Sequence, residues 1–209
     1  MKSLISLLLF TVAVTSAQHT IPFASHNNKI ELSVFNKAEI TAESVTVVAT
    51  SMPKWVRFSQ SKDELKNIVS RRTGIAQFTF SVDKTAPVHA SEKIEFTIIS
   101  ANGEQWKKEI SVEVAAPQTF ELFQNYPNPF NPSTTISYQL PVNSNVSLKV
   151  YDILGKEVMT LVNGPNEAGY HQSIFNANSV ASGVYFYRLI AETQNGKKEV
   201  FHKKMLMMK

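Results

Sequence analysis

The stretch IEFTIISANGEQWKKEISVEV, residues 94–114, decides the fold of the first half of the chain. On either side of Asn102-Gly103, large apolar residues recur at every second position, from Ile94 to Ile98 and from Ile110 to Val114. A period of two places apolar side chains on one face of a strand and polar side chains on the other. Asn-Gly favours positive φ and a tight turn. The stretch is therefore predicted to be a β-hairpin with one buried and one solvated face.

The same period recurs along the chain, and Pro, Gly and Asn mark the turns between the runs. Further runs are found at residues 30–34, 45–49, 55–57, 76–82, 136–140, 146–150, 158–162, 170–175, 184–191 and 199–207. Short strands at this spacing are typical of immunoglobulin-like sandwiches. One stretch differs, because Leu65, Ile68 and Val69 are spaced as on a helix, so residues 62–69 predict one helical turn in a crossing loop.

Ala115-Ala116-Pro117-Gln118-Thr119 does not alternate, and Pro117 lacks a backbone donor, so this segment is predicted to connect two modules. The fold prediction is an all-β chain: two small antiparallel β-sandwiches, immunoglobulin-like and in tandem. The first covers residues 18–116, the linker covers 117–119, and the second covers 120–209.

Composition excludes several classes of protein. The 209 residues include 43% hydrophobic and 18% charged side chains and no Cys, which rules out collagen-like, coiled-coil and disulfide-scaffold chains. The formal net charge of +4 is spread among mixed signs, whereas nucleic-acid binding needs a concentrated Lys/Arg face. No nucleic-acid partner and no stable membrane span are predicted.

The first seventeen residues have the order of a secretory signal peptide. Lys2 precedes the apolar run Leu4–Val14, and the small residues Thr15-Ser16-Ala17 suit signal peptidase, with cleavage expected after Ala17. A membrane anchor is the alternative, but the run falls short of the roughly 18 apolar residues that span a bilayer. A bacterial lipoprotein would need a Cys after the cleavage site, and the chain has none.

One octapeptide stands out in the second half: Asn125-Tyr126-Pro127-Asn128-Pro129-Phe130-Asn131-Pro132. Its three Pro fix φ near −65° and disfavour helix at the preceding residues, so this segment, the strap, is predicted to be stiff and extended. Tyr126 and Phe130 are expected to pin it to a sandwich, and Asn128 and Asn131 to cap backbone groups. A Pro-rich ligand for an aromatic groove is the alternative.

Further motifs follow the strap in order. They are Ser133–Pro141, Val146–Val158, Ala168-Gly169-Tyr170-His171, Ala181–Leu189 and the basic end Lys203–Lys209. In this order, residues 120–209 resemble the type A C-terminal sorting domain of the type IX (Por) secretion system of Bacteroidetes and their relatives. The resemblance implies export through the periplasm, recognition by an outer-membrane translocon, and removal of the domain by a sortase-like surface protease. The product is then released or joined to anionic lipopolysaccharide.

Most motif residues also have a structural interpretation. Asp152 and Gly155 bracket a tight turn, and Gly155 suits the left-handed conformation that such turns need. The Lys-rich last strand is either a protected, solvated edge or a handle for the translocon, and deleting Phe201–Lys209 is expected to leave the precursor in the periplasm. The candidate sorting residues are Asn125, Tyr126, Pro127, Asn128, Pro129, Phe130, Asn131, Pro132, Asp152, Gly155, Lys156, Gly169, Tyr170, Gly183, Tyr185, Lys203, Lys204 and Lys209.

The first module, residues 18–116, resembles bacterial immunoglobulin-like accessory domains of surface enzymes in its Trp55, its Ala86-Pro87 and its strand spacing. It has no Gly-x-Ser-x-Gly elbow, no His-Glu-x-x-His and no Cys nucleophile. The five His are scattered, so no catalytic, metal or cofactor site is predicted. Pairing of Glu43 with Glu95, or of Asp63 with Glu64, stays open.

Trp55 and Trp106 are the residues of this module with possible ligand contact. Exposed indoles would stack on sugar rings, whereas buried indoles would belong to the core, and both lie within alternating runs that favour burial. The predicted function of the module is a non-catalytic structural or adhesive role. The alternative is a small carbohydrate-binding module or surface hydrolase with a site built from loops.

Overall fold

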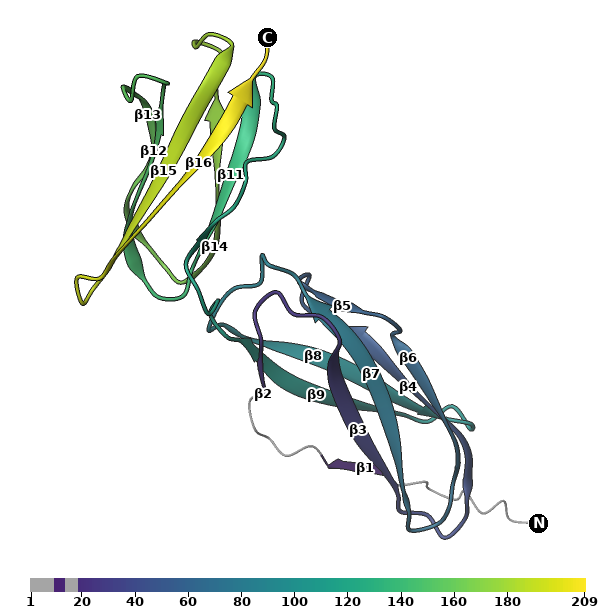
Figure 1. Cartoon of the computed structure of the whole chain (residues 1–209). Coiled ribbons are helices and arrows are strands. Elements are labelled where there is room, and N and C mark those ends of the chain that lie inside the picture. Colours follow the sequence, from purple (N-terminus) through teal and green to yellow (C-terminus); the bar gives the residue numbers. More distant parts are fainter. Residues whose placement is uncertain (1–9, 14–18) are drawn as a thin grey trace. The chain divides into compact units, whose positions relative to one another are not determined.

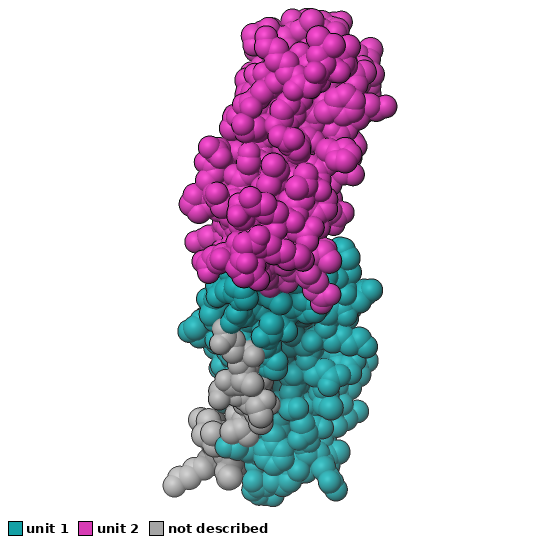
Figure 2. Space-filling model, turned by 60° about the vertical axis from the view of Figure 1, so that its left-hand side comes forward, with its two compact units in different colours: residues 1–115 teal, residues 116–209 magenta. Residues whose placement is uncertain are grey.

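The computed structural model describes residues 10–13 and 19–209. The regular secondary structure of these residues consists of strands joined by turns and loops, with no helix (Figure 1). The predicted signal peptide and its cleavage site therefore lie outside the described residues, apart from the strand β1 (Phe10–Ala13). The chain divides into two compact units, unit 1 (Met1–Ala115) and unit 2 (Ala116–Lys209), which are coloured separately in Figure 2. The prediction of an all-β fold is confirmed.

Unit 1 contains two sheets. One has the order β1-β3-β7-β5 and the other the order β2-β9-β8-β4-β6. The strands after β1 are β2 (His19–Ile21), β3 (Asn28–Asn36), β4 (Ala42–Ser51), β5 (Val56–Phe58), β6 (Lys62–Ile68), β7 (Thr73–Val82), β8 (Ser91–Ser100) and β9 (Gln105–Val114). All the pairings are antiparallel except that of β2 with β9.

The predicted hairpin is present as β8 and β9. Ile94 pairs with Ile110, and both side chains are buried, as are Phe96 and Val112. Gly103 in the turn has φ of +85°, which suits the residue that lacks a Cβ. The apolar face of this hairpin packs into one core with side chains of the other sheet, including Phe78, whose ring centroid lies 4.9 Å from that of Phe96.

The prediction of a helical turn at residues 62–69 is wrong. Lys62–Ile68 is the edge strand β6, which pairs antiparallel with β4. Leu65 pairs with Val45 and packs against the core, and Ile68 is buried. Asn67 has φ of +55°, a local irregularity that lets two apolar residues at a spacing of three both face inward.

Unit 2 also contains two sheets, of order β10-β11-β14 and β13-β12-β15-β16. The strands are β10 (Glu121–Leu122), β11 (Ser133–Leu140), β12 (Ser144–Tyr151), β13 (Glu157–Asn166), β14 (Gly169–Asn176), β15 (Gly183–Thr193) and β16 (Lys198–Met207). Alternate residues of β12 and β15, from Val146 to Val150 and from Tyr185 to Ala191, are buried between the sheets. Each unit therefore has a hydrophobic core of its own.

None of the described residues belongs to a helix long and apolar enough to cross a membrane.

Candidate functional site

The strap lies along the outer edge of β16 in unit 2. The backbone N–H of Phe130 donates to the carbonyl of Leu206, and the N–H of Met208 donates to the carbonyl of Phe130, both at 3.0 Å. Asn128 Oδ1 accepts the N–H of Leu206 at 2.9 Å, which confirms its expected capping of a backbone group. The C-terminal half of β16 therefore has a covered edge, not a bare one.

Phe130 anchors the strap in the core. Its side chain is 2% exposed and meets Phe175 edge-on, with ring centroids 5.8 Å apart. The expectation that Tyr126 also pins the strap is wrong, because its side chain is 82% exposed. Only the backbone of Tyr126 is engaged, through two hydrogen bonds of 3.0 Å with Thr135. The three Xaa-Pro peptide bonds of the strap are cis.

A buried polar cluster holds the start of the strap. Asn125 is 2% exposed, and its side-chain amide donates to Thr134 Oγ1 at 2.9 Å and to the carbonyl of Pro127 at 3.0 Å. The backbone N–H of Asn125 donates to the hydroxyl of Tyr187, and that hydroxyl donates to the carbonyl of Phe123, both at 2.9 Å. Buried polar groups need such partners, so the first Asn of the motif has a structural role.

The turn between β12 and β13 has the predicted geometry. Gly155 has φ of +79°, and Asp152 Oδ1 accepts the backbone N–H groups of Leu154 and Lys156 at 2.9 and 3.0 Å. The side chain of Asp152 is therefore used within the turn. Ile153 and Leu154 at its tip are exposed.

The remaining motif residues begin strands or fill the core. Gly169 and Gly183 are the first residues of β14 and β15. Tyr170 contacts Phe123 on the outer side of β14, with ring centroids 5.9 Å apart. Tyr185 is buried, and its hydroxyl donates to the carbonyl of Ala181 at 2.7 Å.

The basic C-terminus is tied to the module. The backbone N–H of Lys209 donates to Ser182 Oγ at 2.9 Å, and Lys209 Nζ donates to the carbonyl of Asn178. Lys203 is half-buried and Lys204 is exposed, and the backbone carbonyl of Lys204 accepts a hydrogen bond from the side chain of Gln124. Asn131, Pro127, Pro129 and Lys156 are exposed, and Pro132 is half-buried.

Burial raises the pKa of Tyr138 and of Tyr187 to about 12, and the Asn125 N–H lowers the pKa of Tyr187 in part. The folded state holds these two protons above the ordinary pKa of 10.0, so the stabilisation that they contribute to unit 2 should be complete below about pH 10 and be lost as the pH rises towards 12. A near-ultraviolet titration of the whole chain should show two of its six Tyr ionising late, and Tyr187→Phe should remove one late step. Late ionisation that is unchanged in Tyr187→Phe would contradict this assignment.

In unit 1, neither Trp forms an exposed platform. Trp55 is 6% exposed, and its indole N–H donates to Glu92 Oε1 at 3.2 Å. Trp106 is half-buried and packs against the core. The possible ligand contacts of both residues stay predictions, and burial of the indole rings does not favour them.

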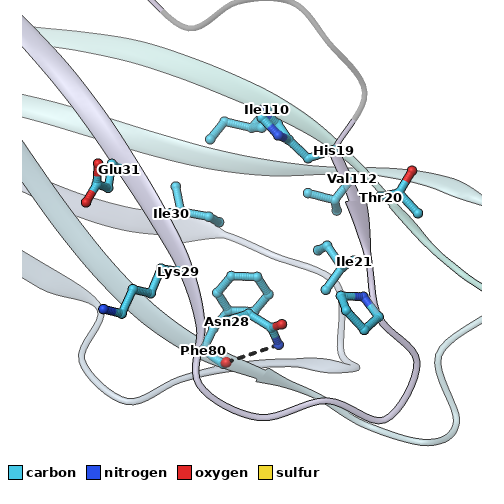
Figure 3. A pocket seen from close by; sticks show the side chains of 11 residues that line it. His19, Thr20, Ile21, Asn28, Lys29, Ile30, Glu31, Phe80, Ile110 and Val112 are labelled. Carbon is cyan, nitrogen blue, oxygen red and sulfur yellow. Dashed lines mark hydrogen bonds between the residues drawn. The ribbon is translucent and has the colours of Figure 1, made fainter.

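One cavity of about 230 Å³ opens beside β2, β3 and β9 (Figure 3). Its inner wall is apolar, with Ile21, Phe80 and Val112 buried, and exposed polar residues such as His19 and Glu31 also line it. Asn28 is tied to the carbonyl of Phe80. The cavity is a gap at the edge of the sandwich, and no sequence motif pointed to it.

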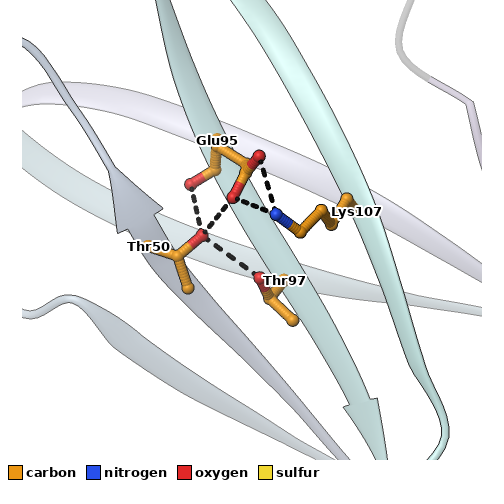
Figure 4. A network of polar contacts seen from close by, with 4 residues as sticks. All are labelled: Thr50, Glu95, Thr97 and Lys107. Atoms are coloured by element: carbon orange, nitrogen blue, oxygen red, sulfur yellow. Dashed lines mark hydrogen bonds and ion pairs between the residues drawn. The ribbon is translucent and has the colours of Figure 1, made fainter.

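Several carboxylates of unit 1 pair with its own side chains. Glu95 contacts Lys107 at 3.1 Å and Thr50 at 3.1 Å, and Thr50 also contacts Thr97 (Figure 4). The hydrogen bonds from Lys107 and from Thr50 hold the pKa of Glu95 below its ordinary value. A carboxylate that stays ionised in this way is unsuited to act as a general acid.

The carboxylates of Asp63 and Glu64, the second pair left open by the sequence, have other partners. Asp63 accepts backbone N–H groups from Glu64 and Gln77, both at 2.8 Å, and Glu64 accepts from Ser44 at 3.1 Å. Among the described residues, no three His, Asp or Glu side chains gather as a metal site would require.

Sequence reasoning missed two parts of unit 2. The hydroxyl of Tyr187 forms hydrogen bonds with the backbones of Phe123 and Asn125, about sixty residues earlier in the chain. The alternation of apolar residues predicts only that Tyr187 faces inward. The strap was also not predicted to cover an edge, because its Pro residues remove the period that would indicate a strand.

Comparison with known proteins gives one family. Residues 124–203 match the model of the secretion system C-terminal sorting domain. No curated protein matches the chain.

Among solved structures, dimeric latent PorU from Porphyromonas gingivalis is 13% identical with a TM-score of 0.35, and the match covers 96% of this chain and 20% of that one. The chaperone YadV is 9% identical with a TM-score of 0.32, over 94% of this chain and 99% of that one. A protein of unknown function from Porphyromonas gingivalis W83 is 11% identical with a TM-score of 0.35, over 95% and 97%. These scores support no argument about function.

The family match falls on unit 2 and includes the strap from Asn125, the turn at Asp152 and most of β16. It agrees with the resemblance found from the motifs. Unit 2 is therefore a C-terminal sorting domain of the type IX secretion system, and the protein that carries it is exported from the cell, either to the surface or into the medium.

Proposed function

We propose that residues 18–116 are a non-catalytic structural or adhesive module, and that the type IX outer-membrane translocon recognises folded unit 2 and delivers this cargo. The observation that supports the proposal most is the architecture of unit 2. The strap, the turn at Asp152–Lys156 and the last strand belong to one sandwich with its own core. Unit 1 has a separate core, so it is suited to persist after unit 2 is removed.

The chemistry of unit 1 favours a structural role over catalysis. Glu95 and Glu109 are ion-paired with Lys107 and Lys93, and Trp55 is buried and hydrogen-bonded. A sandwich whose polar side chains pair with each other across the strands offers contact surface and rigidity, not a reactive group.

A small carbohydrate-binding module or loop-built hydrolase is the second candidate. The cavity beside β2 and β3 favours it, because this cavity combines apolar walls with exposed polar side chains, as ligand pockets do.

The proposed route has four partners, including the translocon. Signal peptidase cleaves after Ala17, the translocon carries the chain across the outer membrane, and a sortase-like protease cuts near residues 116–120. The cargo is then released or joined to anionic lipopolysaccharide.

Mass spectrometry of surface and medium fractions tests the route. We expect a fragment that begins at Gln18 and ends near residue 116, without peptides from unit 2. The matched control is a chain that lacks residues 120–209, which should stay in the periplasm. Export of this control would contradict the role of unit 2, whereas an exported, uncut chain would contradict only its removal.

A further inference from the structure

The two outer faces of unit 2 differ in charge. Strands β11 and β14 contain no Lys, Arg, Asp or Glu, and their outer face carries Ser, Thr and Gln side chains with Tyr170 and Ile174. The other sheet is charged, and its strands β12, β15 and β16 contain four Lys and one Arg. A partner that recognises unit 2 by its charge would therefore bind the second sheet.

Apolar side chains are also exposed on the outer face of that second sheet. Phe186 is 39% exposed, and Val200 and Leu206 of β16 are exposed as well. Leu206 pairs with Val184, and Val200 pairs with Ile190, so the apolar residues lie together across β15 and β16. The core residues Tyr185, Tyr187 and Leu189 point the other way, so packing of this sandwich does not require these outer residues to be apolar.

Two cations flank Phe186 on the same face. Lys204 is its cross-strand neighbour, and Arg188 is two residues further along β15. Tyr151 holds Arg188 in place: the guanidinium lies 4.8 Å from the Tyr151 ring centroid and donates to the Tyr151 hydroxyl. An arginine fixed in this way loses little conformational entropy when it meets a partner carboxylate.

The acidic residues of this face are already used. Glu157 pairs with Lys149 at 2.8 Å, and Glu192 pairs with Lys198 at 3.2 Å. Within the described part of the chain, no ion pair involves Arg188 or Lys204. The face therefore presents two cations that form no salt bridge with a described residue, beside an exposed aromatic ring, and aromatic and Arg side chains are the residue types that anchor protein interfaces.

We propose that this surface, the docking face, is where the sorting domain binds the translocon. The docking face consists of Tyr151, Val184, Phe186, Arg188, Ile190, Val200, Lys204 and Leu206. The complementary partner is a protein surface that presents carboxylates beside apolar side chains. This inference rests on the proposed function. Pairing of a translocon strand with the C-terminal half of β16 is disfavoured, because the strap already covers that edge.

Two matched double variants of the full chain test the docking face. Phe186→Ser with Arg188→Gln removes an apolar side chain and one positive charge from β15. Ile174→Ser with Asn176→Asp also replaces an exposed apolar side chain by Ser and makes the same change in net charge, on the outer face of β14, where both residues are exposed. We expect the first variant to lose about tenfold or more of its surface and medium fraction, since truncated interface anchors have effects of this size. The second should be exported like the original chain.

Each outcome decides the inference. Normal export of the docking-face variant, or equal loss in both variants, would overturn it. The chain without residues 120–209 separates the two claims, because its retention together with normal export of the docking-face variant would leave the proposed function standing. Thermal unfolding of the purified variants checks their fold. The milder Lys204→Gln, at an exposed position of the same face, should also reduce export, and its normal export would contradict the proposal.

Discussion

Phe130→Ala is expected to destabilise unit 2 by about 3–5 kcal/mol, the usual cost of removing a buried Phe and leaving its cavity. The effect should be at the upper end, because Phe130 contacts Phe175 in the core and its own backbone bonds hold the end of β16. Denaturant unfolding of the full chain should show an earlier transition for unit 2 and an unchanged transition for unit 1.

Tyr126→Ala is the matched control in the same strap. Its side chain is 82% exposed, so the change should alter the unfolding free energy by less than about 0.5 kcal/mol. Equal destabilisation by the two variants would show that the strap does not depend on Phe130 as its anchor.

Deletion of Phe201–Lys209 is expected to unfold unit 2 completely. The deletion removes Met205 and Met207 from the core, takes away most of β16, and leaves the strap without its backbone partners in that strand. Limited proteolysis should then digest unit 2 and leave a resistant fragment that ends near residue 115. The expected periplasmic retention of this truncation would follow from loss of the fold.

Lys203→Gln with Lys204→Gln is the control for the deletion. Both backbones stay in β16, so unit 2 should remain resistant to protease and only charge is lost. A protease-resistant unit 2 in the truncated chain would contradict the structural role given to the last strand.

Most strands could be predicted because each module buries one face of each sheet. Apolar and polar residues therefore alternate along the strands. β6 is one exception: positive φ at Asn67 lets Leu65 and Ile68 both face the core, so an irregular strand has the apolar spacing of a helix. The strands β2 and β10 were also missed, because they are too short to show a period. A local pattern cannot separate these cases, since the partner strand β4 decides between them.

The site could be predicted only as a set of motifs. The turn at Asp152 and Gly155 could be predicted, because a tight turn depends only on residues that are neighbours in the sequence. The choice between Tyr126 and Phe130 as anchor depends on Phe175 and β16, which are distant in sequence. The docking face could not be predicted from the sequence either, because Phe186 and Lys204 become neighbours only through the register of β15 and β16.

The pairing of the strap with β16 joins the beginning of unit 2 to its very end, since Asn128 and Leu206 are 78 residues apart. This closure cannot form before residues 206–208 have been synthesised, because they supply its backbone partners. A chain that is cut or terminated early has no strand to complete this edge. Unit 2 therefore depends on two segments from its opposite ends to complete this edge of the sheet.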